Sequence, residues 1–131
     1  MSARRLERSL TVEPDPAAVR TARDFVYRTC TAAGLDDDTC SSAVLLSSEL
    51  VTNAFMHGRS QARVRVVADP TSLRVEVGDD NSRHPAAQEE DADALDGRGM
   101  VIVNLVARSW GVADDPYGKV VWFELDGPPT G

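Results

Sequence analysis

Apolar residues recur at helical spacing in two long segments that follow a short alternating stretch near the N-terminus. The alternating stretch, residues 6–12 (LERSLTV), predicts an edge strand. The first helix is expected to begin where Asp15 can cap it and Pro16 fits the first turn, and to end near Gly34. Its apolar side consists of Val19, Ala22, Val26 and Cys30.

A second helix is predicted from the acidic sequence DDDTC, residues 36–40, to His57, with Gly58 just beyond it. Acidic residues suit the positive N-terminal end of a helix dipole. At 100° per residue, one continuous arc of this helix is expected to face the core. The arc consists of Ala43, Val44, Ser47, Leu50, Val51, Ala54 and Phe55.

The second half of the chain alternates as strands do. Residues 62–69 (ARVRVVAD) and 73–80 (LRVEVGDD) flank the turn sequence DPTS and predict an antiparallel pair. Residues 81–96 predict a loop, residues 97–112 a glycine turn, a short apolar helix and a brief strand, and residues 118–125 (GKVVWFEL) a closing strand. This order predicts an α+β two-layer fold in one domain, residues 1–131, with frayed ends at residues 1–5 and 127–131.

Composition narrows the class of protein. The chain has 131 residues, 42% of them apolar, with a net charge of −7 that disfavours a nucleic-acid partner. No signal peptide and no membrane span is recognised, so a cytoplasmic location is expected. Cys30 and Cys40 are expected to be reduced structural thiols, and His57 and His84 are not spaced as zinc ligands.

Three polar residues of the second helix follow one another at intervals of four. Asn53 and His57 lie about 40° and about 80° from Glu49 around the helix, so the three line one edge of the buried face. A carboxylate at such an edge can act as a base, and a carboxamide oxygen can bind Mg²⁺. The same spacing is also typical of solvated helix residues, and the spacing alone leaves both interpretations open.

Further candidates lie downstream. Asp79 ends a strand, where an aspartate is commonly a turn former, and the sequence GRG, residues 97–99, opens a helix whose N–H groups could attract phosphate. The loop before it carries Glu89, Glu90, Asp91, Asp93 and Asp96, which suits a solvated connector and a functional lid equally. Neither a Walker A sequence nor a GxSxG elbow occurs.

The order of these segments resembles that of the GHKL ATPase superfamily, whose members share the Bergerat ATP-binding fold. More closely, the chain resembles the small bacterial regulators of the anti-sigma-factor serine kinase group. ELVTNAFMHG is similar to the N box, VEVGDD to the adenine-recognition box, GRGMVIVNLVARSWGV to the phosphate-binding box and GKVVWFEL to the closing strand. The resemblance implies a two-layer α/β sandwich whose mixed, mainly antiparallel sheet is covered on one face by helices.

The resemblance also implies ATP and Mg²⁺ as ligands. It makes Glu49 the general base, Asn53 the magnesium ligand and residues 82–96 the lid over the nucleotide. Asp79 would accept a hydrogen bond from the adenine amino group. The residues implied to line the nucleotide site are Asn53, His57, Asp79, Asn81, Gly97, Arg98, Gly99 and Met100.

In the kinase members of this group, ATP phosphorylates a serine of an anti-anti-sigma antagonist with a STAS domain, and unphosphorylated antagonist frees the sigma factor. The implied partners are therefore such an antagonist and a sigma factor, and a homodimer is also implied. Two departures favour an alternative, a non-catalytic Bergerat-fold module that sequesters a partner. Asn81 stands where the family commonly has glycine, and the acids of the lid would repel a triphosphate.

Overall fold

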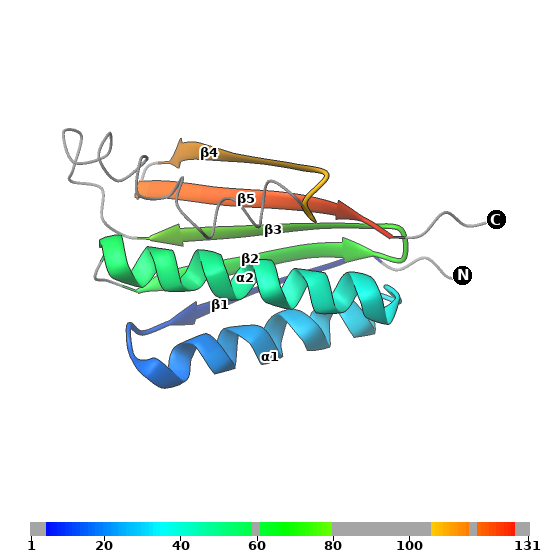
Figure 1. Ribbon diagram of the computed structural model, residues 1–131, viewed down its shortest axis with the longest axis horizontal. Helices are drawn as coiled ribbons and strands as arrows, with labels where there is room; N and C mark the ends of the chain where they lie inside the picture. Colours follow the sequence, from blue (N-terminus) through cyan, green and yellow to red (C-terminus); the bar gives the residue numbers. More distant parts are fainter. Residues whose placement is uncertain (1–4, 59–60, 80–105, 116–117, 128–131) are drawn as a thin grey trace.

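The computed structural model describes residues 5–58, 61–79, 106–115 and 118–127 of the chain. Two helices cover one face of a sheet, which gives two layers (Figure 1). In chain order the elements are β1 (Leu6–Val12), α1 (Pro16–Ala32), α2 (Asp37–Gly58), β2 (Ala62–Asp69), β3 (Ser72–Asp79), β4 (Ser109–Asp115) and β5 (Gly118–Asp126). The predicted α+β two-layer architecture is confirmed.

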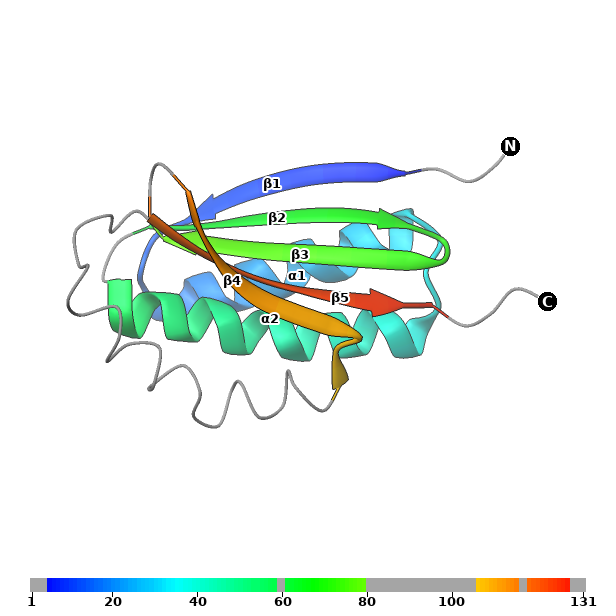
Figure 2. The same cartoon turned by 90° about the horizontal axis from the view of Figure 1, so that it is seen from above.

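The described strands form one sheet in the order β1-β2-β3-β5-β4 (Figure 2). Each neighbouring pair is antiparallel, so the sheet expected to be mixed is antiparallel throughout the described strands. Val66 lies opposite Val75, and Val75 lies opposite Phe123. This register aligns the apolar side chains of three strands on the helix-covered face, and β1 occupies an edge as predicted.

Helix α1 begins and ends where the sequence predicts. The Ala17 N–H donates to Asp15 Oδ1 at 2.7 Å, which satisfies one of the free donors of the first turn. Gly34 has a φ of +91°, a conformation that favours glycine, and the following Leu35 N–H donates to the Cys30 carbonyl at 3.1 Å. Both the Asp15 cap and the Gly34 stop are confirmed.

Helix α2 is capped by a side chain at its start. Asp36 accepts hydrogen bonds from the Thr39 hydroxyl and, at 3.3 Å, from the Thr39 N–H. The Thr39 hydroxyl is the largest cause that lowers the pKa of Asp36. The acidic start of this helix therefore contributes a specific cap in addition to its favourable position in the helix dipole.

The hydrophobic core lies between the helices and the sheet. Ala43, Leu50 and Val51 are buried as predicted, whereas Val44, Ala54 and Phe55 are only partly buried. Leu46 is completely buried although the predicted arc omits it. The buried face of α2 is therefore shifted relative to the predicted arc, toward the edge that carries Glu49 and Asn53.

The two cysteines belong to this core. Both are free and buried, as the sequence predicts. Burial is the largest cause that raises the pKa of the Cys30 thiol, to about 12. The Cys40 thiol donates to the Leu35 carbonyl at 3.7 Å, which anchors the connection between the helices.

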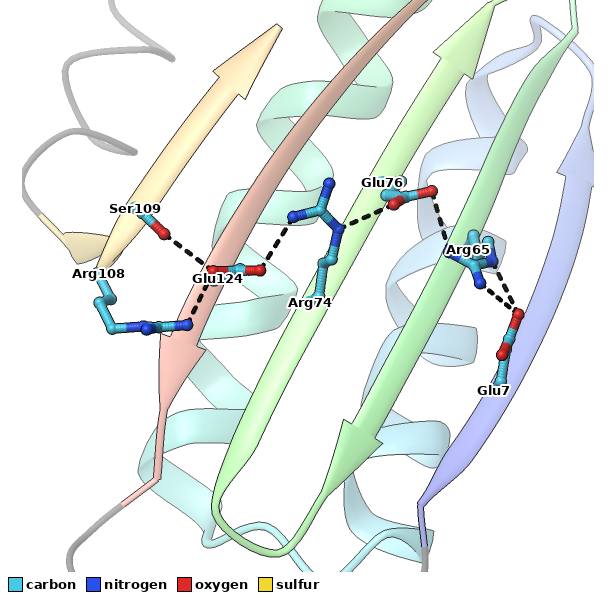
Figure 3. A network of polar contacts seen from close by, with 7 residues as sticks. All are labelled: Glu7, Arg65, Arg74, Glu76, Arg108, Ser109 and Glu124. Atoms are coloured by element: carbon cyan, nitrogen blue, oxygen red, sulfur yellow. Dashed lines mark hydrogen bonds and ion pairs between the residues drawn. The ribbon is translucent and has the colours of Figure 1, made fainter. Parts of the chain in front are cut away.

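The face of the sheet that the helices leave uncovered carries a chain of ion pairs and hydrogen bonds across all five described strands and the residue before β4 (Figure 3). Its members are Glu7, Arg65, Glu76, Arg74, Glu124, Arg108 and Ser109. Arg74 lies between two carboxylates, 2.8 Å from Glu76 and 2.9 Å from Glu124. Glu76 contacts Arg65 of β2 as well as Arg74, and Glu124 contacts Arg74 of β3 as well as Arg108, so the network links strands that are distant in sequence.

The same face holds an aromatic ring between a cation and a glycine. The Arg74 guanidinium lies 4.2 Å from the centroid of the Trp122 ring. Gly111 lies opposite Trp122 in the sheet, and a Cβ at Gly111 would come within 2.8 Å of the ring. The absence of a side chain at position 111 therefore allows the ring to lie against the strand.

The residue that follows β5, Gly127, corrects one expectation. Gly127 was expected in a frayed end, but its N–H donates to the Thr71 carbonyl at 2.8 Å. This bond ties the residue after β5 to the β2–β3 turn. Residues 1–4 and 128–131, the rest of the expected frayed ends apart from Arg5, lie outside the described residues.

Candidate functional site

The C-terminal ends of α2 and β3 lie at the same end of the molecule. Only three residues separate Gly58, the last residue of α2, from Ala62, the first residue of β2. Ala62 lies opposite Asp79 in the β2–β3 register, and Figure 1 shows both elements ending on the same side. The antiparallel pairing therefore brings Asp79 to the end of the helix that carries Asn53 and His57.

Glu49 and Asn53 lie one helical turn apart on α2, and both are half-buried. The neighbouring Leu46 and Leu50 are in the core. Each polar side chain therefore lies at the boundary between the core and the surface. Such a position removes part of the hydration shell of each side chain.

Neither side chain has a protein partner within the described residues. Glu49 and Asn53 form no hydrogen bond and no ion pair there, in contrast to the carboxylates of the open sheet face, Glu76 and Glu124. Polar groups that are partly desolvated without a partner lose free energy unless something else satisfies them. Within the part of the chain that the structure describes, no side chain competes with a ligand for this pair.

Of the other predicted site residues, the structure describes the backbone of two, and the rest lie outside the described residues. His57 lies in the last turn of α2, and Asp79 is the last residue of β3. Asn81, Gly97, Arg98, Gly99 and Met100 lie outside the described residues, as do the expected lid (residues 82–96) and most of the helix expected after Gly99. The brief strand expected next corresponds to β4, and the closing strand to β5.

The donor set fits a magnesium ion bound together with a triphosphate. Within the described ranges, His, Cys, Asp and Glu side chains form no cluster of three that could hold a metal ion alone. Mg²⁺ is commonly bound by one or two protein oxygens, with substrate phosphates and water as the other ligands. The Asn53 carboxamide, which has no partner among the described residues, beside the Glu49 carboxylate matches that requirement.

Sequence reasoning missed one surface feature altogether. A hollow lies between α1 and α2 and is lined in part by Arg23, Tyr27 and Leu45. Apolar periodicity identifies the side of a helix that faces the core, and these residues lie on the other side. The only signal in the sequence is the presence of Tyr27 and Leu45 at positions that the periodicity leaves exposed.

The comparison with known families agrees with this geometry. The sequence matches the family described as Histidine kinase-like ATPase domain over residues 12–125, which is most of the chain. The chain therefore belongs to the histidine kinase-like ATPase family. No curated protein matches it. Membership implies an ATP-binding function, typically with Mg²⁺, and confirms the predicted GHKL type of fold.

Of the helices in the described ranges, none is both long enough and apolar enough to cross a bilayer.

Proposed function

We propose that this chain is an ATP-dependent protein-serine kinase of the anti-sigma-factor type. Its substrate is a serine of an anti-anti-sigma protein with a STAS domain, and it regulates transcription by binding a sigma factor. The observation that carries the proposal is the half-buried pair Glu49 and Asn53, without protein partners in the described residues, at the α2 edge of a histidine kinase-like ATPase domain. The sigma factor and the antagonist are proposed from the sequence resemblance.

The chemistry follows from the two side chains. The Asn53 carboxamide oxygen would bind Mg²⁺. Bound Mg²⁺ would neutralise charge on the triphosphate during phosphoryl transfer. The Glu49 carboxylate would accept the proton of the attacking serine hydroxyl. Because Leu46 and Leu50 exclude water on one side of the pair, electrostatic interactions there are stronger than in bulk water.

The remaining contacts to the nucleotide are part of the same proposal. Asp79, at the end of β3, would accept the hydrogen bond of the adenine amino group. His57 would lie at the edge of the site. The segment of Gly97, Arg98, Gly99 and Met100 would bind the phosphates, and Asn81 would lie near the adenine.

The kinase proposal predicts separate effects on transfer and binding. With Mg-ATP, the full chain should phosphorylate a cognate STAS protein, and Glu49→Ala should reduce transfer by at least about 100-fold because the base is removed. ATP binding by the variant, measured by calorimetry, should remain close to that of the wild type. Radiolabelled phosphate on the STAS serine provides the readout.

Thr52→Ala is the matched control, because Thr52 is exposed on the same helix. It should transfer phosphate at the wild-type rate. Full transfer by Glu49→Ala would rule out the role of Glu49 as the base.

A second function is favoured by two features of the sequence. Asn81 in place of a glycine and the five acids between Glu89 and Asp96 would weaken nucleotide binding. The alternative is a non-catalytic module that sequesters a partner. ATP bound without any transfer to a STAS partner that itself binds the chain would favour this alternative over the kinase.

A further inference from the structure

The two helices form a groove on their outer surface. A hollow of about 480 Å³ lies between α1 and α2 and is lined by Arg23, Tyr27, Ser41, Val44, Leu45 and Ser48. A second hollow, of about 330 Å³, extends along α1 and is lined by Arg20, Arg23, Asp24, Tyr27 and Val44. Because the hollows share three residues, they form one continuous surface, which we call the helix groove.

The centre of the helix groove is apolar and accessible. Leu45 is 46% exposed and Tyr27 is 41% exposed, while Val44 is half-buried. The Tyr27 hydroxyl donates to Asp37 Oδ1 at 3.3 Å, which orients the ring between the two helices. Side chains of this kind on adjacent helices provide a contact surface for a further apolar element.

Two positively charged side chains beside this surface have no partner within the described residues. Arg20 and Arg23 form no ion pair and no hydrogen bond within the described residues, whereas Arg65, Arg74 and Arg108 are each paired with carboxylates. Asp24, which also lines the groove, pairs with Arg28 at 3.2 Å. In a chain with a net charge of −7, two neighbouring arginines without a partner in the described ranges are a local concentration of positive charge.

We propose that the helix groove is a docking surface for an acidic amphipathic helix of another protein. The apolar stripe of that helix would contact Tyr27, Val44 and Leu45, and its carboxylates would pair with Arg20 and Arg23. Glu49 and Asn53 do not line the groove. Docking therefore requires no nucleotide, and the proposal does not depend on the kinase assignment.

A pair of synthetic peptides tests this proposal on the full chain without nucleotide. One is a helical peptide of about 18 residues with a leucine stripe flanked by glutamates, and its twin carries lysines in place of the glutamates. By fluorescence anisotropy, the acidic peptide should bind at least about tenfold more tightly than the basic twin. This preference should largely disappear at about 1 M salt, where surface charges are screened.

Variants of the chain test whether the helix groove causes the preference for the acidic peptide. The double substitution Arg20→Glu with Arg23→Glu should weaken the acidic peptide by at least about tenfold and favour the basic twin. Leu45→Ala should weaken both peptides, because apolar contact is lost. Arg8→Glu, an exposed arginine of β1 that lines neither hollow, is the control and should leave the preference unchanged. Circular dichroism melts check that each variant folds.

Three results would overturn the proposal. The first is equal affinity for the two peptides, and the second is a double variant that binds the acidic peptide as tightly as the wild type. The third is self-association in sedimentation experiments that the double variant abolishes, without peptide binding, because the groove would then hold a second copy of the chain. Loss of kinase activity alone would affect none of these outcomes, so the two proposals can fail separately.

Discussion

Ser47 shows how a single residue of the site helix can be polar without being available to a ligand. It belongs to the buried arc of α2, it is 0% exposed, and its hydroxyl has no hydrogen-bond partner among the described residues. Glu49, two residues along the helix, is half-buried and lies at the surface boundary. The hydroxyl of Ser47 has thus lost its water without a compensating hydrogen bond, which is unfavourable for folding.

Ser47→Ala should therefore stabilise the protein, by about 1 kcal/mol, because it removes an unsatisfied buried hydroxyl and leaves only a small change in volume. Urea unfolding monitored by tryptophan fluorescence measures the change. Ser48→Ala, at the half-buried neighbouring position, should change the free energy of unfolding by less than about 0.5 kcal/mol. A less stable Ser47→Ala protein would show that the hydroxyl has a partner in solution.

Individual residues were predictable from the sequence where the signal is local. The Asp15 cap and the Gly34 stop depend on neighbours within a few positions, and both are confirmed. Leu46 was missed because it lies between Asn53 and His57 in helical angle, so the polar neighbours obscured its buried position. That Arg20 and Arg23 have no partner in the described part of the chain could not be predicted, since pairing depends on which elements lie opposite them.

The turn between β2 and β3 is also specified by residues that are close together in the sequence. Asp69 Oδ1 accepts hydrogen bonds from the Thr71 N–H at 2.8 Å and the Ser72 N–H at 2.9 Å. The Thr71 N–H is the largest cause that lowers the pKa of Asp69. The sequence DPTS therefore specifies the turn, and the antiparallel strand pair that it predicted is confirmed.

The β4–β5 pair depends on a feature that alternation does not reveal. Gly111→Ala should destabilise the protein by about 1–3 kcal/mol, because the new Cβ would meet the Trp122 ring at 2.8 Å and displace it from Arg74. Thermal unfolding and the near-ultraviolet circular dichroism of tryptophan measure the two effects. Ala113→Gly, on the same strand, is a control for backbone flexibility and should leave the tryptophan signal unchanged.

Unchanged stability together with an unchanged tryptophan signal in Gly111→Ala would contradict the packing of Trp122 against β4.

The ion pairs of the open face show why contacts between distant residues could not be predicted from the sequence. Arg74 contacts Glu124, which is fifty residues away in sequence, and only the strand register determines that the two lie side by side.

For the molecule as a whole, the open-face network makes stability dependent on pH. Glu124 is bound by Arg74 and also accepts hydrogen bonds from Ser109 and Arg108, at 3.0 and 2.8 Å. The hydrogen bond from Arg74 is the largest cause that lowers the pKa of Glu124 below its ordinary value of 4.5. Because the folded state holds this carboxylate ionised, its contribution is complete above that value and is lost as the pH falls below it.

Glu124→Gln should therefore be less stable than the wild type near pH 7, and the difference should shrink as the pH falls below about 4. Urea unfolding over this pH range gives the two curves. The other carboxylates are common to both proteins, so the difference isolates Glu124. A difference that is constant with pH would contradict a lowered pKa at this residue.

The fold as a whole was predictable because its elements carry strong periodicity and their order matches one architecture. The described part of the site was predictable only as a set of separate positions. Nothing within residues 49–57 indicates that Asp79 lies at the same end of the molecule, since this follows from the β2–β3 register. The resemblance supplied that connection, and the family match supports it.

The central claim is that the α2 edge with Glu49 and Asn53 binds Mg-ATP, and calorimetry on the full chain tests it most directly. Wild type and Thr52→Ala should bind Mg-ATP with equal affinity, and Asn53→Ala should bind at least about tenfold more weakly, a loss of about 1.4 kcal/mol. The Asn53→Ala protein should keep the wild-type free energy of unfolding without nucleotide, because Asn53 has no partner in the described residues. No binding by the wild type at about millimolar Mg-ATP, or equal binding by wild type and Asn53→Ala, would contradict the account.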